Sequence, residues 1–110
     1  MAGYFALGRG KSGKFTFNLK SGNHQVILTS EAYESREAAL GGIASVQRNG
    51  TDDARFERKV ARNGGAYFVL KATNGQVVGK SQMYSSSAAT ERGVASVKAN
   101  AAATLVKETA

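Results

Sequence analysis

The sequence contains no cysteine, which excludes disulfide bonds, thiolate catalysis and sulfur-ligated metal sites. It also has no apolar run approaching the ~20 residues that cross a bilayer. Its first residues, MAGYFALGRG, lack the basic segment and the long apolar segment of a secretory signal peptide. We therefore expect a cytoplasmic protein that neither enters a membrane nor needs a cofactor.

Acidic residues are few, because eight Asp and Glu stand against fifteen Lys and Arg, and the net charge is +7. Such an excess concentrates anionic partners near the surface, and it is equally compatible with solubility alone. The positive charges are dispersed, apart from Arg55, Arg58, Lys59 and Arg62, which crowd around Glu57. Charge alone therefore leaves nucleic-acid binding as one hypothesis among several.

The chain repeats itself. The stretch GGIASVQRN (Gly41–Asn49) returns as RGVASVKAN (Arg92–Asn100), and a shift of 51 residues aligns the two halves without a gap. A tandem duplication of this period is typical of one supersecondary unit per copy.

Within a copy the hydrophobic period changes along the chain. YFALG (residues 4–8) and GKFTFNLK (residues 13–20) read as strands, and HQVILT (residues 24–29) follows as a third strand after the turn SGN. The period then becomes helical, with Ser35 and, in the second copy, Ser86 as N-caps. We expect the first helix to end in a left-handed residue at Asn49–Gly50.

The sequence thus predicts an α+β fold, a tandem duplication of a β-β-β-α unit with antiparallel strands and one helix per repeat. Repeat 1 spans residues 1–50 and repeat 2 spans residues 51–110, including a C-terminal tail, AAATLVKETA, that we expect to be partly disordered. About 50 residues bury too little to be stable alone, so the repeats should share one core as one cooperative domain related by a pseudo-twofold axis. The residues expected to be buried are Phe17, Leu19, Ile43, Phe68, Leu70 and Val94.

The repeated GIASV-type segment is expected to be a packing motif. Glycine inside a helix costs about 1 kcal/mol relative to alanine and needs a reason, and small side chains permit close approach to a sheet or another helix. Tyr33 and Tyr84 precede the two helices and are expected to cover their first turns, with ligand stacking as the alternative.

No combination of residues predicts catalysis. The lone histidine, His24, stands in a predicted turn and is replaced by Gly75 in the second copy. Asp52 and Asp53 are adjacent in a polar linker, and the serines of residues 85–87 have no base near them in sequence. LGRGKSGK does not meet the spacing of a phosphate loop. We expect no catalytic, cofactor or metal residue.

Polar residues kept in both copies are the candidate binding residues. A two-residue turn at Gly22-Asn23 would place Lys20 opposite Gln25, and the same holds for Lys71 and Gln76. Each pair is interpreted first as a cross-strand hydrogen bond and second as a duplicated anion site. Arg55 and Lys59 are expected on one strand face, with Arg58 and Arg62 on the other. The candidate contacts for an anion or polyanion are Lys20, Gln25, Lys71, Gln76, Arg55 and Lys59.

The repeat words also carry a resemblance. GKFTFNLKSGNHQVILTSEAYESREAALGGIASVQRN and GAYFVLKATNGQVVGKSQMYSSSAATERGVASVKAN share the pattern F-x-F-x-L-K-x-x-N-x-Q-x-I, then S-x-x-Y, then G-I-A-S-V-x-x-N. This pattern resembles the YegP-like family of small uncharacterised bacterial proteins. The second copy departs from it with Ala66 in place of Phe15 and Gly79 in place of Leu28. The resemblance implies an α+β fold of paired repeats, and it implies no activity.

Three classes of function follow from the sequence. The preferred class is a small, soluble, non-enzymatic interaction or structural module, with an unknown partner that is expected to be a protein. The alternatives are a weak, largely sequence-independent binder of nucleic acid or another polyanion, and an enzyme of unknown type. Because the duplication supplies internally what a dimer supplies between chains, we expect a monomer.

Overall fold

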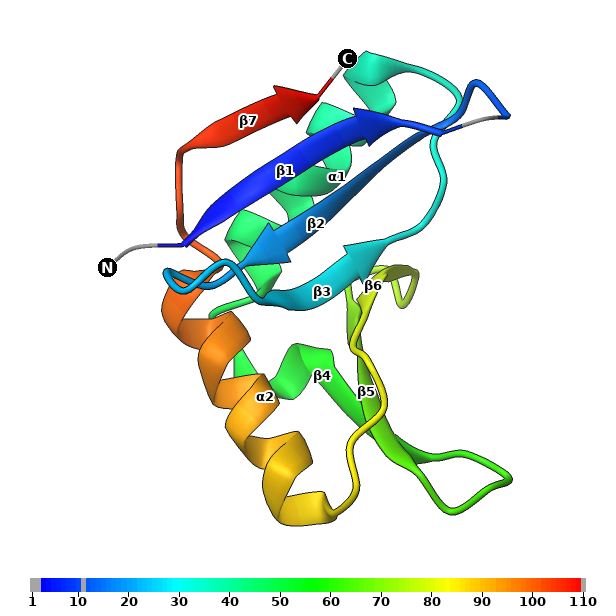
Figure 1. Ribbon diagram of the computed structural model, residues 1–110, viewed down its shortest axis with the longest axis vertical. Helices are drawn as coiled ribbons and strands as arrows, with labels where there is room; N and C mark the ends of the chain where they lie inside the picture. The colour runs from blue at the N-terminus through cyan, green and yellow to red at the C-terminus, as the bar shows by residue number, and fades with distance from the viewer. Residues whose placement is uncertain (1–2, 11, 110) are drawn as a thin grey trace.

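The structure is a computed structural model that describes residues 3–10 and 12–109 (Figure 1). Its elements in chain order are β1 (Tyr4–Arg9), β2 (Phe15–Lys20), β3 (Val26–Ser30), α1 (Arg36–Asn49), the 3-10 turn η1 (Asp53–Arg55), β4 (Phe56–Val60), β5 (Ala66–Lys71), β6 (Val77–Lys80), α2 (Ser87–Asn100) and β7 (Val106–Thr109). The fold is therefore α+β, as the sequence predicts.

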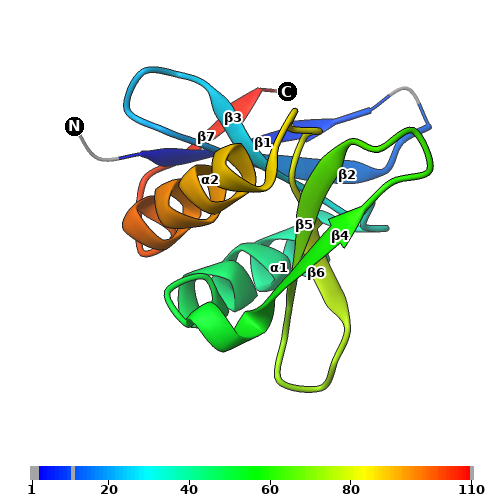
Figure 2. The same cartoon turned by 90° about the horizontal axis from the view of Figure 1, so that it is seen from below.

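The strands form one seven-stranded sheet in the order β4-β5-β6-β3-β2-β1-β7. β3 and β6 join the two halves through the antiparallel pairs Thr29 with Lys80 and Ser30 with Gly79. Both helices pack on the same side of this bent sheet, and each contacts strands of both halves (Figure 2). Segments from the two repeats are therefore interleaved.

The core lies between the sheet and the helices. The six residues expected inside are all buried, with 0–3% of their surface exposed, which confirms the predicted faces: Phe17, Leu19, Ile43, Phe68, Leu70 and Val94. Buried side chains of both repeats belong to a single hydrophobic cluster. Its aromatic contacts are duplicated, since Phe5 meets Phe17 edge-on and Phe56 meets Phe68 edge-on.

The repeated helix glycines make room for the repeated tyrosines. A Cβ at Gly42 would collide with the Tyr33 hydroxyl, and one at Gly93 would collide with that of Tyr84. Each tyrosine ring stacks on a core phenylalanine, at 6.1 Å from Phe17 and 6.3 Å from Phe68 between ring centroids. The packing interpretation of this motif is thus confirmed, and the close neighbour is a tyrosine ring at the start of the helix.

The hairpin turns differ from the prediction. The backbone N–H of Ser21 donates to the Gln25 carbonyl, and that of Ala72 donates to the Gln76 carbonyl, which encloses three residues rather than two. The third residue of each loop has a positive φ, 69° at His24 and 82° at Gly75. The repeated asparagines before them act through their side chains, since Asn23 and Asn74 accept hydrogen bonds from Gln25 and Gln76 backbone N–H groups.

The helix N-termini follow the prediction and the first C-terminus does not. Ser35 and Ser86 each accept a hydrogen bond from the backbone N–H three residues later, at 3.1 Å. Gly50 has a right-handed φ of −71°, so the expected left-handed residue is wrong. Glycine is required there because a Cβ would come within 2.5 Å of the Ala101 Cβ and 2.7 Å of the Val46 carbonyl oxygen.

The C-terminal tail is also corrected. Its residues Val106–Thr109 form β7, which pairs with β1 in parallel, so the strands are not all antiparallel. Arg36, at the start of α1, fixes this strand by donating from Nε to both carboxylate oxygens of Glu108, at 2.9 and 3.1 Å. β7 thereby covers β1 and forms one edge of the sheet, and β4 forms the other.

Candidate functional site

One row of side chains crosses the whole sheet on the face that the helices leave uncovered, which we call the outer face. The strand registers join its members in the order Lys107, Ala6, Asn18, Thr29, Lys80, Val69 and Glu57. Because side chains alternate along strands, the neighbouring outward positions include Tyr4 opposite Lys20, and Lys59 opposite Tyr67.

The outer face is basic. Among the residues that the structure describes on its strands, it carries five lysines and one carboxylate, Glu57: the lysines are Lys20, Lys59, Lys71, Lys80 and Lys107. Glu57 lies 3.1 Å from the Lys71 Nζ and 3.3 Å from the Lys59 Nζ. These two ammonium groups, Lys71 first, hold the pKa of the Glu57 carboxyl below its usual range, so the carboxylate stays charged between them.

Two other lysines of the outer face lie over tyrosine rings. The Lys107 Nζ is 4.5 Å from the Tyr4 ring centroid, and the Lys80 Nζ is 5.0 Å from that of Tyr67. A ring quadrupole attracts a cation without neutralising it. Lys80 and Lys107 therefore keep their full charge available to an anion.

The arginine-rich cluster predicted from the sequence is divided in the structure. Arg55 precedes β4 and lies in η1. The expectation that Arg55 and Lys59 share one strand face is therefore wrong. Arg58 points to the helix side, where it bridges Glu91 at 2.8 Å and Asp53 at 3.0 Å. These contacts raise the pKa of Arg58 and lower the pKa of each carboxyl, so Arg58 is committed to its acidic neighbours.

The proposed cross-strand pairs are not formed. Lys20 is in register with Val26, and Lys71 with Val77, because each hairpin loop holds three residues rather than two. Gln25 and Gln76 instead lie at the hairpin turns. Gln25 lines a hollow of about 540 Å³ beside the C-terminal end of α2, and Gln76 lines a larger one beside α1.

The hollow beside α1, which we call the α1 groove, has a volume of about 660 Å³. It lies where α1 of the first repeat faces the β5–β6 turn of the second. Its polar lining consists of Tyr33, Ser45, Arg48, Asn49, Asp52, Arg55, Thr73, Asn74 and Gln76, and its apolar lining is Ala38, Gly41, Gly42, Ala72 and Val78. The closest contact between charges in it joins the Arg55 Nε to the Asp52 Oδ2, at 3.5 Å.

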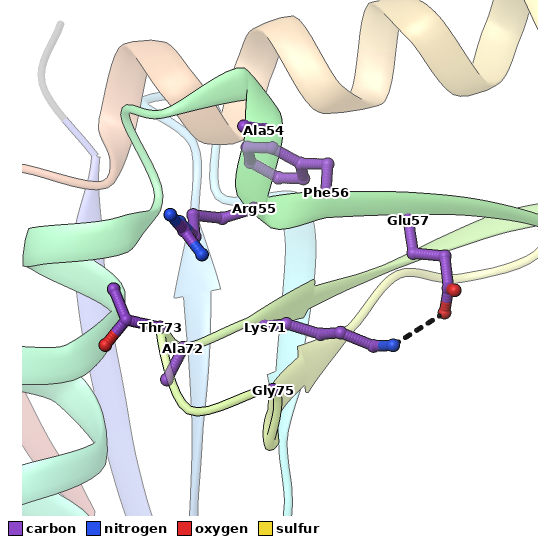
Figure 3. A pocket seen from close by; sticks show the side chains of 8 residues that line it. All are labelled: Ala54, Arg55, Phe56, Glu57, Lys71, Ala72, Thr73 and Gly75. Carbon is purple, nitrogen blue, oxygen red and sulfur yellow. Dashed lines mark ion pairs between the residues drawn. The ribbon is translucent and has the colours of Figure 1, made fainter.

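Figure 3 shows a second hollow, of about 350 Å³, in which the Arg55 side chain extends toward the Thr73 loop and Lys71 toward Glu57. Arg55, Ala72 and Thr73 border both hollows. Arg55 and Gln76, two of the predicted contact residues, are thus brought to the α1 groove, whereas Lys20, Lys59 and Lys71 lie on the outer face.

Burial raises the pKa of Tyr33, with the nearby Glu31 as a smaller cause, so the phenol remains a neutral donor. His24 contacts the Tyr4 hydroxyl at 2.9 Å through Nδ1.

No group of three or more metal-ligating residues occurs in residues 3–10 and 12–109. None of the helices in this part of the chain is long and apolar enough to cross a membrane.

The sequence interpretation missed several residues. Lys107 fell in the tail expected to be disordered, although V-K-E-T alternates as a strand does. Lys80 had a usable signal, since it alternates with Val78. Arg48 and Gly41 had none, because the hollow that they line is completed by the β5–β6 turn of the other repeat.

A protein-family model described as "Domain of unknown function (DUF1508)" matches this chain twice, at residues 11–57 and 61–108. The first match runs from the turn before β2 through α1 into β4, and the second from the turn before β5 through α2 into β7.

Two relatives match this chain over nearly its whole length. UPF0339 protein PM0519 of Pasteurella multocida (strain Pm70) is 56% identical over 106 residues, which cover 96% of this chain and 93% of that protein. UPF0339 protein YegP of Escherichia coli (strain K12) is 49% identical over 108 residues, which cover 98% of each chain.

Two solution NMR structures have the same fold. That of yegP from E. coli, described as a protein of unknown function, matches with a TM-score of 0.94 and 49% identity, covering 99% of this chain and 94% of that one. That of UPF0339 protein SO3888 from Shewanella oneidensis matches with a TM-score of 0.92 and 46% identity, covering 98% and 92%.

Proposed function

This chain belongs to the family of proteins built on DUF1508, and we propose that it is a non-enzymatic module that binds polyanions such as single-stranded nucleic acid on its outer face. The resemblance to the YegP-like family is confirmed, since YegP itself is 49% identical to this chain. The names of these relatives assign neither a reaction nor a ligand, so the proposal rests on this chain's own residues.

The observation that carries the proposal is the distribution of charge over the sheet. Five lysines and one glutamate occupy the described outer face. Two carboxylates elsewhere pair with arginines on the helix side, Glu91 with Arg58 and Glu108 with Arg36. The net charge of +7 is therefore unevenly spread, and a polyanion gains most by contacting the outer face.

The residue types set the strength and selectivity. The cations of this face are lysines, which act as point charges, whereas base reading usually employs the bidentate geometry of arginine or amide groups. Tyr4 and Tyr67 already carry lysines on their rings, which limits base stacking. We expect sequence-independent binding with a dissociation constant of roughly 10⁻⁴ to 10⁻⁶ M.

This proposal reverses the order of preference reached from the sequence. The sequence placed a non-enzymatic interaction or structural module above a polyanion binder, because the positive charges are dispersed along the chain. The strand registers bring Lys20, Lys80 and Lys107 to one face, which supports the second hypothesis.

The experiment is a titration of fluorescein-labelled oligothymidylate with the full chain, read by fluorescence anisotropy between about 50 and 200 mM salt. The double variant Lys80→Gln/Lys107→Gln should weaken binding and reduce the salt slope by about 1.4, since each single-strand phosphate contact contributes ~0.7. The control Arg92→Gln/Lys98→Gln removes the same charge from α2. Equal losses in both variants, or no binding by the wild type at low salt, would overturn the proposal.

A second part of the proposal concerns the arrangement of the two repeats. We infer that the two repeats are related by a pseudo-twofold axis between β3 and β6 and form one cooperative, monomeric domain in the cytoplasm. Duplicated buried contacts support the symmetry: Ser30 accepts from the Phe17 backbone N–H at 2.8 Å, and Ser81 from that of Phe68 at 3.0 Å. Sedimentation at about twice the chain mass would contradict the monomer.

A further inference from the structure

We propose that the α1 groove is a binding site for a small organic phosphate, which is a second site, separate from the outer face. The phosphate group would lie against the Arg48 and Arg55 side chains. The uncharged part of the ligand would lie along α1 at Gly41 and Gly42, between Tyr33 and Val78.

Gly41 is a helix glycine that the packing of the fold does not explain. A Cβ at the adjacent Gly42 would collide with Tyr33, whereas a Cβ at Gly41 would meet nothing within 4 Å. Glycine weakens a helix relative to alanine, so its presence without a packing reason points to another constraint. Gly41 lines the α1 groove, and its missing side chain leaves bare helix backbone for a ligand to approach.

The α1 groove is rich in residues that can donate hydrogen bonds. Its lining includes Arg48, Arg55, Ser45, Tyr33 and Gln76, whose side chains all carry donors. Asn49 donates to the Ser45 Oγ at 3.2 Å, so the Ser45 hydroxyl hydrogen remains available to a ligand. The Arg55–Asp52 contact of 3.5 Å is longer than a charge-assisted hydrogen bond, and Arg55 can exchange it for a closer anion.

The number of donors favours phosphate over carboxylate. A carboxylate offers two acceptor oxygens, whereas a terminal phosphate offers three strong ones and carries more charge. Two arginines with a hydroxyl and an amide match three oxygens better than two. The volume of about 660 Å³ exceeds what a bare phosphate fills and is in the range of small-molecule sites.

The corresponding hollow of the other half serves as an internal comparison. Beside α2, the residues aligned with Gly41 and Arg48 are Arg92 and Ala99. The described lining of that hollow is Ser21, Gly22, Asn23, Gln25, Ser96 and Asn100, which includes no cation. The anion site is thus expected in one half only.

The test is a titration of the full, ¹⁵N-labelled chain with AMP at millimolar concentration, followed by amide chemical shifts. The expected result is a saturable shift of resonances in α1 and the β5–β6 turn. Inorganic phosphate should compete, and adenosine should bind about tenfold more weakly because it lacks the charged group.

Gly41→Ala is the decisive variant. Alanine should raise the midpoint of thermal unfolding by about 4 to 8 °C, because its Cβ enters open space in a helix. The same change should weaken AMP binding, and Arg48→Gln should weaken it about tenfold. A variant that is stabilised and still binds AMP as the wild type does would overturn the proposal, as would shifts confined to the outer face.

Two further arms separate a free phosphate from the phosphates of a nucleic acid. The outer-face variant Lys80→Gln/Lys107→Gln should bind AMP normally, and Gly41→Ala should bind oligothymidylate without terminal phosphates normally. If both ligands lose affinity in both variants, there is one polyanion surface and no separate site.

Discussion

β1 and β4 hold the same place in the two repeats, yet β1 is an inner strand and β4 is an edge strand. Phe5 and Phe56 are aligned and both buried, but Leu7 of β1 is aligned with Arg58 of β4. β7 covers Leu7, which is 2% exposed, whereas the Arg58 side chain is 33% exposed and bridges to α2. The aligned phenylalanines lie in the shared core. The change from Leu7 to Arg58 accompanies the change from an inner strand to an edge strand.

This comparison explains the composition of β4. An unpaired strand offers free N–H and C=O groups to other chains, and charged side chains on such an edge prevent that pairing. β4 reads FERKV, with Arg58 and Lys59 exposed, whereas β1 reads YFALGR and is closed by β7. The β4 edge is thus protected by charge, whereas β1 is protected because β7 pairs with it.

The largest effect is expected where the two halves are alike. Phe17→Ala and Phe68→Ala should each lower the free energy of unfolding by about 3 to 5 kcal/mol, because both rings are fully buried. Chemical denaturation of the two variants gives the comparison directly. A loss below about 1 kcal/mol in one of them would show that its half of the core is loosely packed.

The next effect comes from removing the strand that distinguishes the two edges. A chain that ends at Ala103 lacks β7 and should lose about 2 kcal/mol, because it uncovers Leu7 and removes the partly buried Val106. It should also self-associate through the bare edge of β1, which sedimentation measures. Glu108→Ala is the control, since it removes only the exposed ion pair with Arg36 and should cost much less stability than the truncation does.

The smallest change in stability is expected from Arg58→Leu, which gives β4 the residue of β1. The ion pairs to Glu91 and Asp53 are exposed to solvent, so their loss should change the free energy of unfolding only slightly. The variant should nevertheless form dimers at high concentration, because the charge that protects the edge is gone. Arg62→Leu adds the same side chain in the exposed turn after β4. Equal association by both variants would refute a role for the edge.

The sequence correctly predicted those features of the fold that depend on residues close together in the chain. The alternation around Phe17 and Phe68 identifies the inner face, and Ser35 and Ser86 identify the helix starts, because both depend on neighbours within a few residues. Gly50 was misinterpreted because its neighbour, Ala101, belongs to the other repeat. β7 was missed because its partner β1 lies at the far end of the chain.

The predictions for the candidate site residues also succeeded where they depend on neighbours in the chain and failed where they do not. The alternation of side chains predicted that Lys59 and Arg58 lie on opposite faces of the strand, and the structure has them there. The Lys20–Gln25 pairing was wrong because the loop includes a third residue, His24. This residue is left-handed, a conformation that glycine adopts easily and that a histidine does not signal. The α1 groove could not be predicted, because one wall comes from each repeat.

The parallel pairing of β1 with β7 has a mechanical consequence. The chain enters the sheet at one end of β1 and leaves it at the opposite end of β7 (Figure 1). A force applied to the two termini therefore pulls the two strands in opposite directions along their length. Their hydrogen bonds are loaded together in shear and must break together rather than one after another. A hairpin pulled open from its free ends has no such resistance.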